Sequence, residues 1–367
     1  MVGLAPGLGA VANMIFSPFG GVLADRLNRR TILIVAQLTT ASAILILGIL
    51  TVADVVQVWH IFLVTVVQRV TMGLQLATRN TLMYDVVGPR VFMNAMAGQF
   101  MSTHAASVLA PLAGGFLMAY YGPGYLFLAI GSIILLGTLF LLAVPSVPVA
   151  RSVGSMWGNL KEGIGFVLHD RPVRTVLWTV LITDGLGFST QAMFPVVTRD
   201  VLHAGPVVLG LLSTFRGAGG VVGSLIISSF GDIKAKGFVF IGAALIFGVF
   251  IVLFAISRSF PLSLVFILLV GAFATTYDTM AHTLLQTMTP EVMRGRVMGI
   301  YSFVVSGIGL GALGLGALTG LVGVSWALAA AGSAVASNAV VRLPMARVLS
   351  ERSASRIAEA LPTTKDS

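Results

Sequence analysis

Apolar runs of about 20 residues recur along the chain, and short segments rich in charge, proline or glycine separate them. A helix needs about 20 apolar residues to cross a hydrocarbon layer about 30 Å thick, so each run predicts a membrane-spanning helix. We predict eleven spans, at residues 2–23, 31–52, 59–82, 94–119, 123–144, 173–195, 207–229, 237–257, 261–284, 296–322 and 324–343.

The composition agrees with a protein that is embedded in a bilayer, because 57% of the residues are hydrophobic and only 10% are charged. Soluble domains contain about 45–50% apolar and about 25% charged residues. The sequence therefore predicts an all-α integral membrane protein in contact with lipid.

The formal net charge of +9 is spread over alternate loops and the C-terminal tail. If the loop of residues 25–30 faces the cytoplasm, the opposite side of the membrane holds only Arg199 and Arg258 among the basic residues. Cytoplasmic loops carry the excess of lysine and arginine. We therefore expect a multi-pass protein of the cytoplasmic (inner) membrane with a cytoplasmic C-terminus. Nucleic acid is not needed to explain the charge.

Chemistry that depends on cysteine is excluded, because the chain has none. The sequence also has no metal-ligand cluster, nucleophile elbow or phosphate-binding loop. We expect no cofactor, no metal and no enzymatic activity. Met1 runs directly into apolar sequence, so the first segment is predicted to be a span and not a cleaved signal peptide.

The longest polar interval divides the predicted spans into five and six. We predict a first bundle at residues 1–144, a cytoplasmic linker at 145–172, a second bundle at 173–343 and a cytoplasmic tail at 344–367. Apolar residues at helical spacing within 155–168 predict an interfacial helix in the linker.

The two halves repeat one another, as in folds built from internal repeats. Asp25 with Arg29 corresponds to Asp232 with Lys236, at an offset of 207 residues. The segment 89–98 corresponds to 290–299 at an offset of 201, and Arg294 and Arg296 lie in that second loop. By the same offset, the partner of the sixth span would precede residue 1, so we expect one helix to be missing at the N-terminus.

The first predicted loop contains Gly21, Asp25, Arg26, Arg29 and Arg30. This segment resembles the cytoplasmic loop signature of the major facilitator superfamily, in which Asn28 replaces the usual glycine. The resemblance implies two bundles of six helices, here twelve minus the first, and a loop that latches one access state. The alternative is that these cations only set topology.

Two further signatures resemble those of the same superfamily. Arg69, four residues before Gly73, lies near the middle of a span, where the resemblance implies a role in proton coupling; a structural hydrogen-bonding role is the alternative. Pro111, Gly114 and Gly115 resemble a signature of exporters and antiporters, and they predict a bend at a tightly packed seam.

Three other charged residues lie inside predicted spans, namely Asp184, Arg216 and Asp278. Intramembrane charges are functional candidates because they are expensive to bury. The two aspartates could carry a proton, bind a cationic substrate or neutralise Arg216, and the sequence does not distinguish these roles. For His104 and His282 we expect ordinary buried hydrogen bonding.

Within the superfamily, the chain resembles the branch of bacterial enterobactin exporters and related drug-efflux proteins. The resemblance rests on Arg79, on the linker segment 157–163 and on the segments 285–290 and 294–298. It implies proton-coupled export of small apolar or amphipathic molecules, of the drug or siderophore class, by alternating access. Solute/proton symport is one alternative, and a non-transporting membrane protein or regulatory partner is another.

Overall fold

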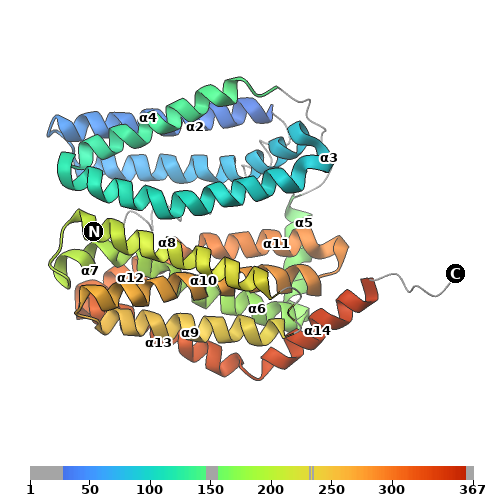
Figure 1. Ribbon diagram of the computed structural model, residues 1–367. Coiled ribbons are helices and arrows are strands. Elements are labelled where there is room, and N and C mark those ends of the chain that lie inside the picture. Colours follow the sequence, from blue (N-terminus) through green and yellow to red (C-terminus); the bar gives the residue numbers. More distant parts are fainter. Residues whose placement is uncertain (1–27, 146–155, 231–232, 234, 361–367) are drawn as a thin grey trace.

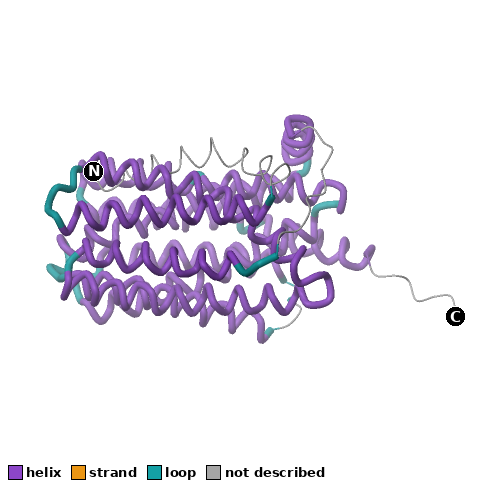
Figure 2. Tube along the Cα trace, turned by 90° about the horizontal axis from the view of Figure 1, so that it is seen from above, coloured by secondary structure: helices purple, strands orange, loops and turns teal. Residues whose placement is uncertain are grey.

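The computed structural model describes residues 28–145, 156–230, 233 and 235–360, and all regular secondary structure in these ranges is helical (Figures 1 and 2). The elements of the first part are α2 (Arg29–Val52), α3 (Val58–Tyr121), α4 (Pro123–Leu142) and α5 (Met156–His169). The others are α6 (Arg171–Ile182), η1 (Thr183–Gly187), η2 (Phe188–Met193), α7 (Phe194–Asp200), α8 (Pro206–Ser229), α9 (Lys236–Ile256), α10 (Phe260–Met288), α11 (Glu291–Ser306), α12 (Ile308–Val322), α13 (Val324–Arg342) and α14 (Met345–Ala360).

Eight segments of the described residues are long and apolar enough to cross a membrane. They coincide with eight of the predicted spans. Two more, 59–82 and 94–119, lie within α3, which continues across a kink at Gly88 (φ 71°, ψ 169°). Glycine adopts this positive φ without steric cost, and Pro89 can begin the next helical segment. The predicted span 2–23 lies outside the described residues.

The helices lie in two groups, which Figure 1 shows one above the other. In the upper group, α2 packs on both α3 and α4. Small residues allow close approach: a Cβ atom on Gly131 would lie 2.6 Å from Cγ of Leu45, and one on Gly124 would lie 2.6 Å from Val52 Cγ2. A buried hydrogen bond of 2.7 Å joins the hydroxyls of Thr40 and Thr71.

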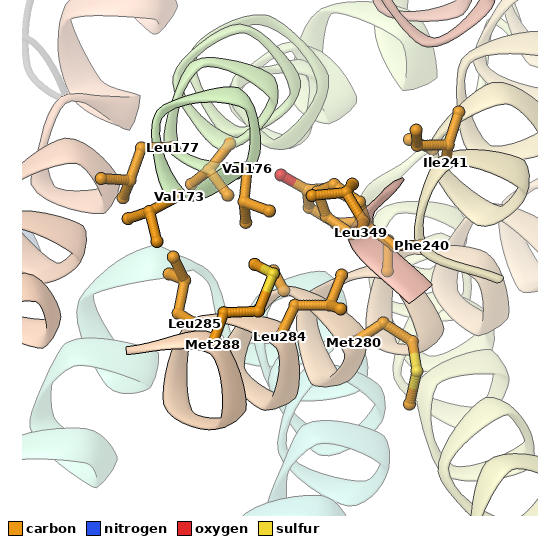
Figure 3. Packing of buried hydrophobic residues seen from close by; sticks show 14 of the residues in the cluster. Val173, Val176, Leu177, Phe240, Ile241, Met280, Leu284, Leu285, Met288 and Leu349 are labelled. Atoms are coloured by element: carbon orange, nitrogen blue, oxygen red, sulfur yellow. The ribbon is translucent and has the colours of Figure 1, made fainter. Parts of the chain in front are cut away.

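The lower group comprises α6 to α13, with α9 packed between α10 and α13. Side chains of α6 meet those of α10 in a buried apolar cluster, in which Val173, Val176 and Leu284 are fully buried (Figure 3). The predicted span 173–195 is interrupted: it forms α6, then a π-helical turn at η1 and a 3₁₀ segment at η2. Such interruptions of an α-helix often occur at functional sites.

The linker helix α5 and the C-terminal helix α14 lie at the same end of the molecule, which we name the linker end (Figure 1). The end where α3 finishes and α8 begins is the far end. Most of the predicted tail is a helix that docks on α9 and α10. Ser350 accepts a hydrogen bond from the Gly237 backbone N–H at 3.0 Å, and the Ser353 and Thr287 hydroxyls lie 2.8 Å apart. The helix α14 is therefore part of the folded protein.

Leu349→Ala should destabilise this docked helix. Leu349 is fully buried, whereas its neighbour Val348 is 42% exposed. Truncation of a buried leucine leaves a cavity and costs about 2–5 kcal/mol. We expect a lower thermal midpoint for Leu349→Ala in detergent, measured by intrinsic fluorescence, and little change for the control Val348→Ala. Equal shifts for the two variants would show that α14 is not held by this contact.

Candidate functional site

The two helix groups meet along a seam between α3 and α8. Among the described helices, this is the one extensive contact between the groups. A Cβ atom on Gly115 would lie 2.9 Å from the Gly210 Cα, and one on Gly217 would lie 2.3 Å from the carbonyl oxygen of Ser107. Thr214 donates a hydrogen bond of 3.0 Å to the Val108 carbonyl oxygen. These contacts extend from the far end to the middle of both helices.

The residues of the exporter-like signature have different surroundings. Gly115 faces α8, and the Pro111 carbonyl oxygen lies where a Cβ atom on Gly210 would approach within 2.6 Å. Gly114 instead faces α4, where an added Cβ atom would make an ordinary contact of 3.6 Å with Leu126. Torsion angles remain helical through Pro111, since Gly88 is the one non-helical residue within α3.

At the linker end, the described segments of α3 and α11 that contain Gly98 and Gly299 do not make backbone contacts like those of the seam. An added Cβ atom on Gly98 of α3, or on Gly299 of α11, would meet nothing within 4 Å. Both glycines are exposed, and they belong to the segments that the internal repeat relates. Among the described residues, the close backbone contacts between the two groups are therefore those of the α3–α8 seam, and none of them involves Gly98 or Gly299.

The predicted gating loop falls partly outside the described residues, which exclude Gly21, Asp25 and Arg26. Arg29 begins α2, and Arg30 donates hydrogen bonds to the last carbonyl oxygens of α4, at 3.4 Å to Leu141 and 2.5 Å to Leu142. Cationic side chains are favourable at helix C-termini. Arg30 therefore holds the start of α2 to the end of α4.

In the second-half loop, Asp232 lies outside the described residues, and Lys236 is buried at the start of α9. Arg294 is exposed at the start of α11. Arg296 donates a hydrogen bond to Glu162 and so joins α11 to the linker helix α5. The Arg296 and Glu162 side chains are 25% and 62% exposed, and ion pairs with such exposure contribute little stability.

The structure brings together the two intramembrane aspartates. Asp184 lies in the π-helical turn η1, is 3% exposed, and is near enough to Asp278 of α10 for their charges to repel. Tyr301 of α11 donates a hydrogen bond of 2.6 Å to Asp278. The ring of His282 contacts that of Tyr301 with centroids 4.4 Å apart. We name Asp184, Asp278, Tyr301 and His282 the carboxyl cluster.

Sequence reasoning missed Tyr301. It lies on α11, 23 residues after Asp278, and only the packing of α10 against α11 brings the two together. The internal repeat offered no signal for it, and neither did any of the motifs. The carboxyl groups themselves were detectable because charge inside an apolar run is rare.

The two intramembrane arginines, Arg216 and Arg69, form no ion pair with the aspartates of the carboxyl cluster. Arg216 contacts Gln191 and Phe188, and no described carboxylate forms an ion pair with it. Arg69 is half-buried in α3, and none of the described side chains forms a hydrogen bond or ion pair with it. In this structure, therefore, neither aspartate forms an ion pair with an arginine among the described residues.

Comparison with known proteins agrees with this architecture. The sequence profile of a family described as transmembrane secretion effectors matches residues 1–363. The enterobactin exporter EntS of Shigella boydii serotype 4 is 27% identical over 323 residues, which are 87% of this chain and 76% of the relative. EntS of Escherichia coli O1:K1 is 27% identical over 322 residues, 86% of this chain and 76% of the relative.

Two solved structures show the same fold at low sequence identity. A mutant of the nucleoside transporter NupG is 13% identical, with a TM-score of 0.71 over 94% of this chain and 90% of that one. A bacterial homologue of the human lysosomal transporter Spinster, inward-facing and occupied, is 14% identical, with a TM-score of 0.65 over 100% of this chain and 90% of that one.

Proposed function

Because the chain belongs to the transmembrane secretion effector family of major facilitator transporters, and is therefore a multi-pass membrane transporter, we propose that it exports small apolar or amphipathic molecules. The relatives that it matches are named as enterobactin exporters, which supports the drug or siderophore class of substrate. The site of action is the cytoplasmic membrane, with the linker and the C-terminus in the cytoplasm, as the distribution of basic residues predicts.

The observation that carries this proposal is the seam. Helices α3 and α8 are in backbone contact toward the far end, while Gly98 and Gly299 at the linker end face open space. With the linker in the cytoplasm, this is an inward-open state of an alternating-access transporter. The bundles 1–144 and 173–343 are the proposed moving units. Export requires the seam to part and the linker end to close.

Closure of the linker end is the role that we propose for the gating residues. Asp25, Arg26, Arg29 and Arg30 would form the latch of the first half, and Asp232, Lys236, Arg294 and Arg296 its counterpart in the second. Arg30 binds the end of α4 and Arg296 binds α5 in this structure. Arg30 is therefore attached within the first bundle, and Arg296 is attached to the linker that joins the two bundles.

Proton coupling is assigned to the carboxyl cluster together with Arg69. Two neighbouring carboxyl groups can share and release a proton as a pair. Asp184 supports this role because its Oδ1 is buried without a hydrogen-bond partner among the described residues. Binding of a proton or a cation at this oxygen would lower the free-energy cost of burying the carboxylate.

Transport by everted membrane vesicles tests the proposal. Vesicles that contain the full chain should accumulate members of a dye and siderophore panel when the vesicle lumen is more acidic than the medium, because protons then leave in exchange for solute, and collapse of the gradient should stop accumulation. Arg69→Ala should reduce the gradient-driven rate by about tenfold or more, because its charge lies within the span. The matched control is Arg79→Ala, since Arg79 is exposed on the same helix.

Each alternative function predicts a different result. A symporter would drive solute in the opposite direction relative to the proton gradient. A non-transporting protein would give vesicles that are indistinguishable from empty ones for every compound. Full gradient-driven transport by Arg69→Ala would remove that residue from the coupling mechanism.

A further inference from the structure

A cavity of about 350 Å³ lies beside the seam. It is bounded by η2 and α7 on one side and by α8 on the other. Its lining residues are Gln191, Phe194, Pro195, Leu209, Ser213 and Arg216. Arg216 supplies the one formal charge among them. The cavity is thus an apolar space with a cation and two neutral polar side chains in its wall.

The guanidinium of Arg216 is held by two neutral groups. With its side-chain oxygen toward Arg216, the Gln191 amide lies close to the guanidinium, at 2.9 Å from Nε and 3.0 Å from Nη2. On another side, the guanidinium carbon lies 5.3 Å from the centroid of the Phe188 ring. An amide dipole and an aromatic face attract a cation but do not neutralise it.

Gln191 and Phe188 do not provide hydrogen-bond acceptors for all the N–H groups of Arg216. A guanidinium has five N–H donors, whereas one amide oxygen offers only two lone pairs. None of the described carboxylates lies within ion-pair distance. An arginine inside a membrane span normally has a counter-charge or reaches the interface. None of the described residues therefore supplies a counter-charge for Arg216, and an anion bound in the cavity could supply one.

The backbone around Arg216 is fixed at the meeting point of three helices. A Cβ atom on Gly271 of α10 would lie 2.0 Å from the Arg216 carbonyl oxygen, so α10 packs directly on this turn of α8. The next residue, Gly217, packs on Ser107 of α3 at the seam. Separation of the two helix groups would therefore alter the surroundings of Arg216. Substrate bound at such a position would be coupled to movement of the groups.

We propose that Arg216 binds the anionic group of the transported molecule, and that the cavity takes amphipathic aromatic anions. A carboxylate, phenolate or sulfonate would accept hydrogen bonds from the planar guanidinium, which is well suited to oxyanions. The aromatic body would pack against Phe188 and Phe194. This inference rests on the proposed transport function and specifies the substrate class of that function.

Two dyes with the same xanthene ring system and opposite charge test the inference, namely fluorescein, an anion at neutral pH, and the cationic ester rhodamine 6G. Binding of each to the purified full chain is measured by fluorescence anisotropy, and transport is measured in everted vesicles. We expect Arg216→Gln to weaken fluorescein binding by about tenfold or more, because a charge-assisted hydrogen bond is lost. Rhodamine 6G binding should not weaken.

Two further variants complete the experiment. Arg216→Lys keeps the charge but loses the planar fork, so it should bind fluorescein more weakly than wild type and more tightly than Arg216→Gln. If Arg216→Gln does not fold, the comparison of Arg216→Lys with wild type tests the proposal. The matched control is Arg258→Gln, because Arg258 is exposed in a loop at the far end and should affect neither dye.

The outcomes separate this inference from the transport proposal. If wild type does not bind fluorescein, or if Arg216→Gln binds it as tightly as wild type, the anion site is refuted. Should rhodamine 6G still be transported in that case, the transport function stands. If fluorescein binds through Arg216 but neither dye moves in vesicles, the anion site stands and the transport proposal loses its support.

Discussion

Gly115→Ala should reduce transport by about tenfold or more, whereas Gly114→Ala should leave it nearly unchanged. A methyl group on Gly115 would lie 2.9 Å from the Gly210 Cα and 3.0 Å from the Pro206 carbonyl oxygen. These are backbone atoms, which cannot rotate away. Overpacking of this kind costs about 1–3 kcal/mol, and each 1.4 kcal/mol changes the population of a state about tenfold.

The effect should fall on the closed far end, because that is where Gly115 lies. Since the chain has no cysteine, a single pair of introduced cysteines across the α3–α8 seam can carry spin labels without background. The label distance should increase in Gly115→Ala and stay as in wild type in Gly114→Ala. If both variants transport equally, the seam is not the element that closes the far end.

The second helix of the seam provides an independent check. Gly217→Ala would place a methyl group 2.3 Å from the Ser107 carbonyl oxygen, so it should reproduce the effect of Gly115→Ala. The corresponding control is Gly137→Ala on α4, which adds a methyl group where nothing lies within 4 Å and which is not at the seam or at the linker end. Alanine also raises helix propensity at Gly137, which makes this control conservative.

Asp184→Asn and Asp278→Asn should each uncouple transport from the proton gradient. Asparagine keeps the shape of the side chain but cannot release a proton at neutral pH, so gradient-driven accumulation should fall by about tenfold or more. Exchange of substrate across the membrane without a gradient should persist. Tyr301 can still donate its hydrogen bond to an asparagine oxygen, so Asp278→Asn should fold normally.

Asp54→Asn is the control for this pair. Asp54 is exposed and has a positive φ of 57°, a conformation in which asparagine is well tolerated. Uptake is measured over a range of external pH, and the aspartate variants should show a flat profile where wild type and Asp54→Asn respond. Normal gradient-driven uptake by the double variant of Asp184 and Asp278 would rule out the carboxyl cluster as the coupling site.

Much of the fold follows from local sequence. Eight predicted spans recur as helices capable of crossing a membrane, because an apolar run of that length has few stable alternatives in a bilayer. The break between the spans 59–82 and 94–119 also has a local cause, since Gly88 and Pro89 mark the kink in α3. The helical, docked tail was not predicted, because its apolar face is short and gains stability only from contact with α9 and α10.

The sequence predicted which residues belong to the candidate site but not how they are arranged relative to one another. Charge or paired glycines inside an apolar run identified Asp184, Asp278, Arg216 and Gly115, because such residues are costly or unusual in a membrane span. The sequence left open whether the aspartates face Arg216 or each other. It also gave no reason to treat Gly114 and Gly115 differently, although one faces α4 and the other α8.

The sequence by itself determined the membrane class, the positions of eight spans and the family, since each is encoded in neighbouring residues. Only the tertiary structure decided that Asp184 lies near Asp278, that Arg216 contacts Gln191, and that α3 and α8 are in backbone contact. The physical reason is that the lateral order and rotation of membrane helices depend on close packing between segments far apart in the chain. The sequence of a single apolar run does not specify which other helix will pack against it.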